Sequence, residues 1–147
     1  MQDDEAVALS EERVTPRQQD TLITALRIQE RAAGVGFDWP DASGPILKVK
    51  EELVELERET LKDSLTVAGR GRREAIADEI GDLLFAVVNL ARKLEINPRA
   101  ALERANDKFQ RRFKAVERLA AERGLQMGQA SLEDLDRLWD EVKGQSL

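Results

Sequence analysis

The sequence predicts an all-α protein, both from its composition and from the spacing of its apolar residues. Its 147 residues include four Phe, two Trp and no Tyr, whereas Leu, Ala, Glu and Arg are frequent, which favours helices over sheets. Apolar residues recur every three or four positions over long stretches, as they do on one face of a helix. Because the length is that of one domain, we expect a single helical bundle.

The first helix is expected to follow an acidic tail. Residues 1–14 carry five acidic side chains and few large apolar ones, which predicts a disordered segment. Thr15–Gln18 resembles a helix-capping box with a proline in the first turn. An apolar stripe then continues to about Ala33, and Gly34 or Gly36 should end the helix.

An ordered connector and a second helix are predicted next. Residues 36–40 read GFDWP, a combination too rich in Gly, Pro and aromatic residues for a helix. Trp39 is expected to be a packing anchor rather than a ligand platform. The second helix should run from Gly44 or Pro45 to Thr60, and the two glycines of the stretch 63–71 indicate a loop.

The third helix, predicted from Arg72 to Leu94, is apolar around much of its circumference. Such a helix is expected at the centre of a bundle or in an oligomer interface. Asn97 and Pro98 then supply a cap and a first-turn proline for a fourth helix that should stop at Gly124. A short last helix is expected to begin at Ser131.

Two pairs of carboxylates interrupt the apolar patterns of the second and third helices. Glu52 and Glu55 are three residues apart, as are Glu79 and Asp82, so each pair shares one helix face with Cβ atoms about 5–6 Å apart. If the two helices pack face to face, four carboxylates converge. Buried charges of one sign repel each other and are costly, and a divalent cation removes both problems. All-oxygen ligation favours Mg²⁺, or Mn²⁺, over zinc.

The first pair alone is weak support for a metal site, because Glu is common on exposed helix faces and Lys48 could pair with Glu52 four residues later. The second pair carries more weight, since it lies in the most apolar helix of the chain. Gly81 lies between its two members. A glycine costs about 1 kcal/mol inside a helix, so we expect another helix or a ligand to approach closely there.

Composition excludes several classes of function. The chain has no Cys and no His, which rules out disulfides, zinc–thiolate sites, imidazole bases and Ser–His or Cys nucleophile systems. The net charge of −6 argues against broad binding of nucleic acids or anionic membranes. No apolar run approaches a membrane span and the N-terminus is unlike a signal peptide, so a cytoplasmic location is expected.

Six basic residues between Arg104 and Arg118 form a basic stripe in this acidic protein. Such a stripe predicts either a localised anion site or a solvated helix face with ion pairs, and the sequence leaves both open.

Taken together, these segments resemble the MazG-type nucleoside triphosphate pyrophosphohydrolases. The resemblance rests on residues 48–55 (KVKEELVE) and 78–92 (DEIGDLLFAVVNLAR), and it extends from the GFDWP stretch through residues 105–113 (ANDKFQRRF) to Trp139 and Lys143. It covers roughly residues 20–143 and is closest to the C-terminal catalytic half of two-domain members. The chain is therefore expected to be a single MazG-like domain over residues 15–147.

The resemblance implies a fold, a partner and a set of site residues. It implies an all-α pyrophosphatase fold assembled as a homodimer. The third helix is itself too apolar for a small monomer to cover fully, which predicts a dimer with Leu83, Val87, Leu90 or their neighbours near the interface. The implied Mg²⁺ ligands, which are also the catalytic residues, are Glu52, Glu55, Glu79 and Asp82. The implied substrate contacts are Lys48, Glu51, Asp78, Lys108, Arg112, Trp139 and Lys143.

One departure from the family pattern concerns phosphate binding. Members often carry a Lys shortly before the second acidic pair, where this chain has Ala75, while Arg72 and Arg73 lie about one turn earlier. A cation is therefore expected to reach the phosphates from a different position.

The predicted reaction is hydrolysis of a nucleoside triphosphate to the monophosphate and pyrophosphate, with metal-activated water attacking the α-phosphorus. Lys108 and Arg112 would bind the outer phosphates, and Glu51 would orient the water or support a ligand. Trp139 would stack on a base or sugar, or pack within its helix pair. Two alternatives remain: a pyrophosphatase specific for one deoxynucleoside triphosphate, and a non-enzymatic helical module that binds nucleotide or metal.

Overall fold

The computed structural model of the protein describes residues 21–62 and 70–144. Within these ranges it forms five helices and no strand, which confirms the all-α prediction. The predicted tail 1–14, the capping box at Thr15–Gln18 and most of the loop at 63–71 lie outside the described residues. None of the described helices is long and apolar enough to cross a membrane.

The helices divide between two compact units, Met1–Ile96 and Asn97–Leu147. The first unit contains α1 (Thr21–Gly34), α2 (Ser43–Leu61) and α3 (Arg70–Lys93). The second contains α4 (Pro98–Glu122) and α5 (Leu132–Gly144).

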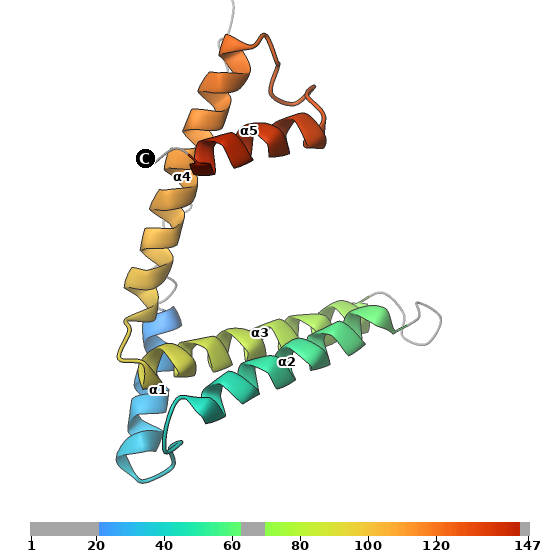
Figure 1. The fold of residues 1–147 in the computed structure, drawn as a ribbon. Coiled ribbons are helices and arrows are strands. Elements are labelled where there is room, and N and C mark those ends of the chain that lie inside the picture. Colours follow the sequence, from blue (N-terminus) through green and yellow to red (C-terminus); the bar gives the residue numbers. More distant parts are fainter. Residues whose placement is uncertain (1–20, 63–69, 145–147) are drawn as a thin grey trace, which may run out of the picture. The chain divides into compact units, whose positions relative to one another are not determined.

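In the first unit, α2 and α3 lie side by side along most of their length, and α1 packs on α3 (Figure 1). The start predicted for the first helix lies outside the described residues, and the other helix ends agree with the predicted ones to within about two residues. At the end of α1, Gly36 has a φ of +89°, and the amides of Gly36 and Phe37 bond back to the carbonyls of Ala33 and Ala32. This left-handed cap stops α1 where a glycine was expected to stop it.

The connector after α1 is ordered, as predicted. Asp38 accepts hydrogen bonds from Arg92 and Lys93 on α3, so the connector is tied to the end of that helix. The Trp39 ring lies against Gly44 at the start of α2, where an added Cβ would overlap it. Trp39 is thus a packing anchor, although 43% of its surface remains exposed.

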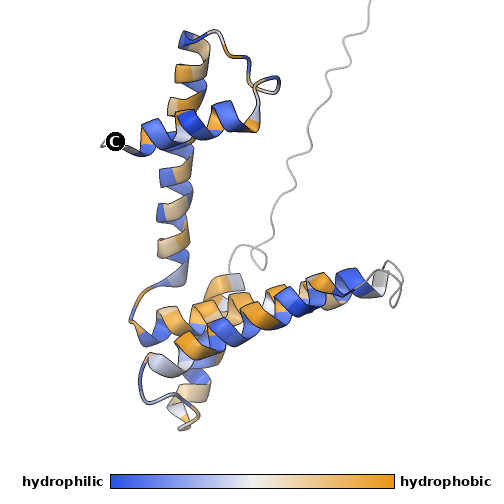
Figure 2. Ribbon diagram, turned by 45° about the vertical axis from the view of Figure 1, so that its right-hand side comes forward, coloured by the Kyte–Doolittle hydropathy of each residue, from blue (hydrophilic) through white to orange (hydrophobic). Residues whose placement is uncertain are grey.

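The core of the first unit is thin. Among its described residues only Ala86 and Val88 are buried hydrophobic side chains of α3. Several large apolar side chains of α2 and α3 are instead about half exposed, and Figure 2 shows apolar residues along both helices. The expectation that α3 is apolar around much of its circumference is therefore met, with part of that surface open to solvent.

The second unit is a helical hairpin with its own core. Ala115, Val116 and Ala120 of α4 pack against Leu138 and Val142 of α5. Both helix starts follow the predicted local signals: the Asn97 side chain accepts a hydrogen bond from the Ala100 amide, and the Ser131 hydroxyl accepts one from the Asp134 amide.

Gly124 ends α4, as predicted. Its φ of +70° is in the left-handed region, and the following amide, that of Leu125, bonds back to the Ala120 carbonyl at 2.8 Å.

Candidate metal and nucleotide site

Three carboxylates converge between α2 and α3. Glu52 and Glu55 lie three residues apart on α2, and Glu79 faces them from α3. One oxygen from each of the three lies within 4.8 Å of the other two. We call Glu52, Glu55 and Glu79 the acidic cluster. It arises because the acidic pair of α2 lies on the side of that helix that packs against α3.

The acidic cluster is partly removed from water. Glu52 is 5% exposed, and Glu55 and Glu79 are half-buried. Burial raises the pKa of Glu79, and the charges of Glu55 and Asp82 raise it further. The carboxylates are therefore held together against their own repulsion.

Two oxygens of the acidic cluster lack a partner. Glu52 Oε2 and Glu79 Oε2 are buried and accept no hydrogen bond from the residues that the structure describes. Orphaned buried carboxylate oxygens are uncommon, and a bound cation is one way to satisfy them. With three oxygen donors at this spacing, the cluster fits a divalent metal ion by geometry and by donor type.

Lys48 is the counter-charge of the cluster. Its ammonium group lies 2.6 Å from Glu52 Oε1 and 3.1 Å from Glu51 Oε1. The hydrogen bonds with Glu52 and Glu51 raise the pKa of Lys48 well above its usual range. The predicted pairing of Lys48 with Glu52 is confirmed, and Glu51 is exposed beside it.

Asp82 is not part of the convergent group. It is exposed on α3, one turn after Glu79, and only the other three carboxylates meet within 4.8 Å. The expectation of four converging carboxylates is therefore met by three. Asp78, a predicted substrate contact, is also exposed on α3.

Gly81 does not mark a close approach between helices. A Cβ built at this position would meet no atom of the described chain within 4 Å. The expected close approach of another helix is wrong for the helices that the structure describes, and the alternative, a ligand that approaches Gly81, stays a prediction.

The remaining predicted substrate contacts lie in the second unit. Lys108 is exposed and Arg112 is half-buried, four residues apart on α4. Lys143 forms an ion pair of 3.1 Å with Asp140. Trp139 packs against the hairpin core, and its ring centroid lies 5.2 Å from that of Phe109. Trp139 therefore has a packing role, and its contact with substrate stays a prediction.

Comparison with known proteins identifies the family. The sequence model of the family described as the MazG nucleotide pyrophosphohydrolase domain matches residues 45–117. This range contains the whole acidic cluster. The nucleoside triphosphate pyrophosphohydrolase of Escherichia coli K12 is 43% identical over 132 residues, which is 90% of this chain and 48% of that protein. The chain belongs to the MazG family.

A second MazG relative gives the same relationship. The nucleoside triphosphate pyrophosphohydrolase/pyrophosphatase MazG of Thermotoga maritima is 42% identical over 123 residues, covering 84% of this chain and 44% of that protein. The chain thus spans about half the length of the curated relatives it matches.

The departure from the MazG pattern at Ala75 has a structural counterpart. Arg72 donates a hydrogen bond of 2.7 Å to the Thr60 carbonyl, which joins the start of α3 to the last turn of α2. Arg73 is exposed one position later. Of the two arginines that could replace the missing Lys, Arg73 is therefore the more accessible.

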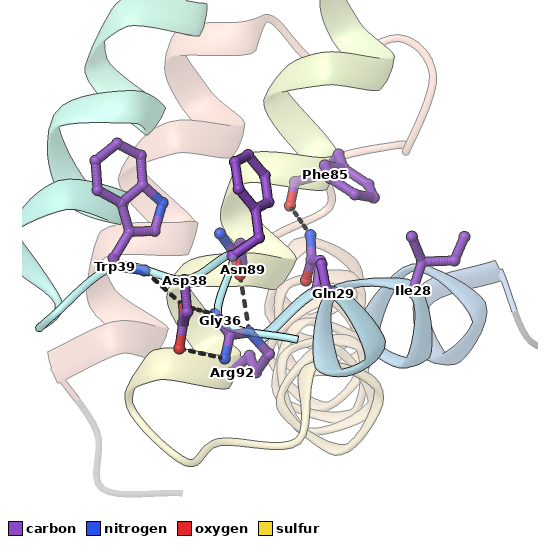
Figure 3. A pocket seen from close by; sticks show the side chains of 10 residues that line it. Ile28, Gln29, Gly36, Asp38, Trp39, Phe85, Asn89 and Arg92 are labelled. Carbon is purple, nitrogen blue, oxygen red and sulfur yellow. Dashed lines mark hydrogen bonds and ion pairs between the residues drawn. The ribbon is translucent and has the colours of Figure 1, made fainter. Parts of the chain in front are cut away.

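Sequence reasoning missed a cavity in the first unit. It has a volume of about 480 Å³ and lies between α1, the connector and α3 (Figure 3). Its walls combine aromatic and polar side chains, chiefly Phe37, Trp39, Phe85, Gln29, Asn89 and Arg92. The only available signal was the aromatic GFDWP stretch, because the polar groups come from helices far apart in sequence.

Proposed function

We propose that this chain hydrolyses nucleoside triphosphates to nucleoside monophosphate and pyrophosphate, and that the reaction depends on Mg²⁺. The observation that carries the proposal is the acidic cluster, three carboxylates within 4.8 Å with two orphaned buried oxygens, inside a MazG domain. The names of both relatives described above support the same activity.

Glu52, Glu55 and Glu79 would hold the ion, and Asp82 would complete the set from one turn further along α3. When bound, the ion would neutralise polyphosphate charge and lower the pKa of a water molecule that attacks the α-phosphorus. The chemistry needs no histidine, which agrees with a chain that has none.

Cations of the chain would bind the phosphates. Lys108 and Arg112, on one face of α4, would hold the outer phosphates and stabilise charge on the departing pyrophosphate. Lys48 and Lys143 carry ion pairs with acidic neighbours, so substrate phosphates would have to exchange with those partners. Glu51 and Asp78 would contact substrate from exposed positions, and Trp139 would offer one ring face.

We also propose that the active form is a homodimer. Ile80, Leu84 and Val87 of α3 are each at least 43% exposed, and Leu53 and Val54 of α2 are also exposed. Monomeric proteins rarely leave so many adjoining apolar side chains in water. A second copy would cover them.

An isotope experiment tests the reaction. The protein is incubated with each common ribo- and deoxyribonucleoside triphosphate and Mg²⁺ in water enriched in ¹⁸O, and the products are analysed by mass spectrometry. Attack at the α-phosphorus places the label in the monophosphate, whereas attack at the β-phosphorus places it in pyrophosphate. Release of orthophosphate, or no turnover of any triphosphate, would refute the proposal. Turnover of a single deoxynucleotide would select the base-specific alternative.

A further inference from the structure

The cavity between α1, the connector and α3 has the features of a ligand pocket separate from the acidic cluster. Its volume of about 480 Å³ is within the range of about 300–1,000 Å³ that is usual for small-molecule sites. Such sites are mainly apolar, with a few polar groups that orient the ligand. None of the three cluster carboxylates lines this cavity.

Gln29 supplies an unsatisfied hydrogen-bond acceptor. The residue is 6% exposed, and its Nε2 donates a hydrogen bond of 2.8 Å to the Phe85 carbonyl (Figure 3). A carbonyl can only accept, so this bond determines which end of the amide carries the oxygen. Gln29 Oε1 is buried and has no partner among the described residues. An orphaned acceptor in a pocket wall is completed by a ligand that brings an N–H donor.

Asn89 supplies the complementary donor. Arg92 Nε donates to Asn89 Oδ1 at 2.9 Å, so the other end of the Asn89 amide is its NH₂ group. The guanidinium of Arg92 is in turn paired with Asp38, as Figure 3 shows. Because the Arg92 charge is already compensated, the cavity suits a neutral polar ligand better than a free phosphate.

Aromatic side chains define the shape of that ligand. Trp39 and Phe85 lie on different sides of the opening in Figure 3, and Phe37 also lines the cavity. Aromatic walls favour a flat ring, which they contact by stacking. A flat ring with an N–H donor and an adjacent acceptor is the chemistry of a nucleobase.

We propose that this cavity is a nucleobase-binding site, in which Gln29 Oε1 accepts a hydrogen bond from the base and the Asn89 NH₂ group donates one. The choice of a nucleobase among flat polar rings rests on the proposed function. The site would bind any common base, since each of them has at least one N–H donor and one acceptor on its hydrogen-bonding edge.

Two sources of the base are compatible with the position of the cavity. Glu79 of the acidic cluster and Phe85 of the cavity lie six residues apart on α3, about 9 Å along the helix axis. This separation suits the base and the phosphates of one extended substrate. The two residues also differ by about 120° around the axis, which suits a second nucleotide bound beside the substrate.

The first experiment measures nucleoside binding without metal. Nucleosides carry no phosphates, so their binding does not require the acidic cluster. Titration calorimetry of the unmodified protein should detect binding of adenosine, guanosine, cytidine, thymidine or uridine. Gln29→Met should weaken binding about three- to tenfold, as expected for one lost hydrogen bond. Gln129→Met, the same change at an exposed turn residue, should leave it unaltered.

A second variant tests the cavity independently, in case Gln29→Met does not fold. Ala32 lines the cavity, and Ala32→Phe should fill it and abolish nucleoside binding while Gln29 remains in place. Thermal melts establish that each variant is folded. Nucleosides that do not bind, or that bind Ala32→Phe and Gln29→Met as tightly as the parent protein, would overturn the proposal.

Kinetics then separate the two sources. If the base belongs to the substrate, Gln29→Met should raise KM for nucleoside triphosphates with little change in kcat, and nucleosides should inhibit competitively. If it belongs to a second nucleotide, nucleosides should bind without competing, and KM should be unchanged. Nucleoside binding that depends on Gln29 in a protein without hydrolytic activity would support the cavity and refute the proposed function, so the two failures are distinguishable.

Discussion

Lys48 and Glu52 lie one turn apart on α2 and form an ion pair of 2.6 Å that places a cation directly beside the acidic cluster. The Glu52 side chain is 6% exposed and that of Lys48 is 42% exposed, so the pair joins a buried charge to a solvated one. Lys48 therefore offsets part of the cost of keeping carboxylates together in the metal-free protein. A cation that binds Glu52 must share or replace this contact.

The first prediction concerns the stability of the metal-free protein. Glu79→Gln should raise the melting temperature at neutral pH, because it removes a carboxylate whose pKa is raised by burial and by the charges of Glu55 and Asp82. Lys48→Met should lower the melting temperature, with a loss of about 1 kcal/mol in unfolding free energy, a modest value because Lys48 is partly exposed. Lys50→Met, the same change at an exposed position of α2, is the control. A lower melting temperature for Glu79→Gln together with a higher one for Lys48→Met would show that charge repulsion does not dominate the cluster.

The second prediction concerns the carboxylates as a unit. Glu52→Gln, Glu55→Gln, Glu79→Gln and Asp82→Asn should each remove most activity and weaken Mg²⁺ binding, measured by steady-state kinetics and titration calorimetry. Double variants should lose little more than single ones, because residues that act together are not additive. Glu57→Gln, on an exposed part of α2, should behave like the parent protein. Full turnover in Asp82→Asn alone would restrict the ligands to the acidic cluster.

The third prediction decides whether the basic stripe binds phosphate. Lys108→Ala or Arg112→Ala should lower kcat/KM about ten- to hundredfold, since a hydrogen bond to a charged group contributes about 1.5–3 kcal/mol. Arg111→Ala and Lys114→Ala change the net charge equally from other faces of α4. Equal losses at all four positions that weaken with added salt would mean that the stripe only attracts substrate.

The fourth prediction is an acid dependence of stability. The hydrogen bond from Arg92, with a further one from Lys93, holds the pKa of Asp38 well below its ordinary value of 3.8. A lowered pKa in the folded state stabilises the fold above the ordinary value, and this contribution is lost as the pH falls below it. Asp38→Asn should therefore destabilise the protein at pH 6 and lose less stability than the parent between pH 4 and pH 2. Melting curves across this range test it, with exposed Asp136→Asn as the control.

The fifth prediction concerns assembly. Sedimentation equilibrium at micromolar concentration should give the mass of a dimer, and Leu84→Lys should shift it to the monomer by placing a charge among the exposed apolar residues of α3. Leu132→Lys is the matched control, since Leu132 is exposed at the start of α5. A monomeric parent protein would refute the homodimer.

Features that depend on neighbours in the chain could be predicted from the sequence. The caps at Asn97 and Ser131, the stop at Gly124 and the pairing of Lys48 with Glu52 each involve residues at most five apart. The metal assignment itself stays a prediction, although three of its four carboxylates converge as expected.

Features that depend on how helices are rotated could not be predicted. The exposure of Asp82 and the open space at Gly81 are set by which side of α3 meets α2, and the apolar pattern of α3 is too even to specify that side. The cavity escaped prediction for a similar reason. Its central bond joins Gln29 to Phe85 across 56 residues, and nothing local to Gln29 indicates a buried amide.

The contact of the Trp39 ring with Gly44 links the size of the cavity to a residue that does not line it. Any side chain at position 44 would overlap the indole and force it to move. The indole is itself a cavity wall, so it would have to swing either into the cavity or out into solvent. A substitution at position 44 would therefore change the volume of the cavity without replacing any residue that lines it.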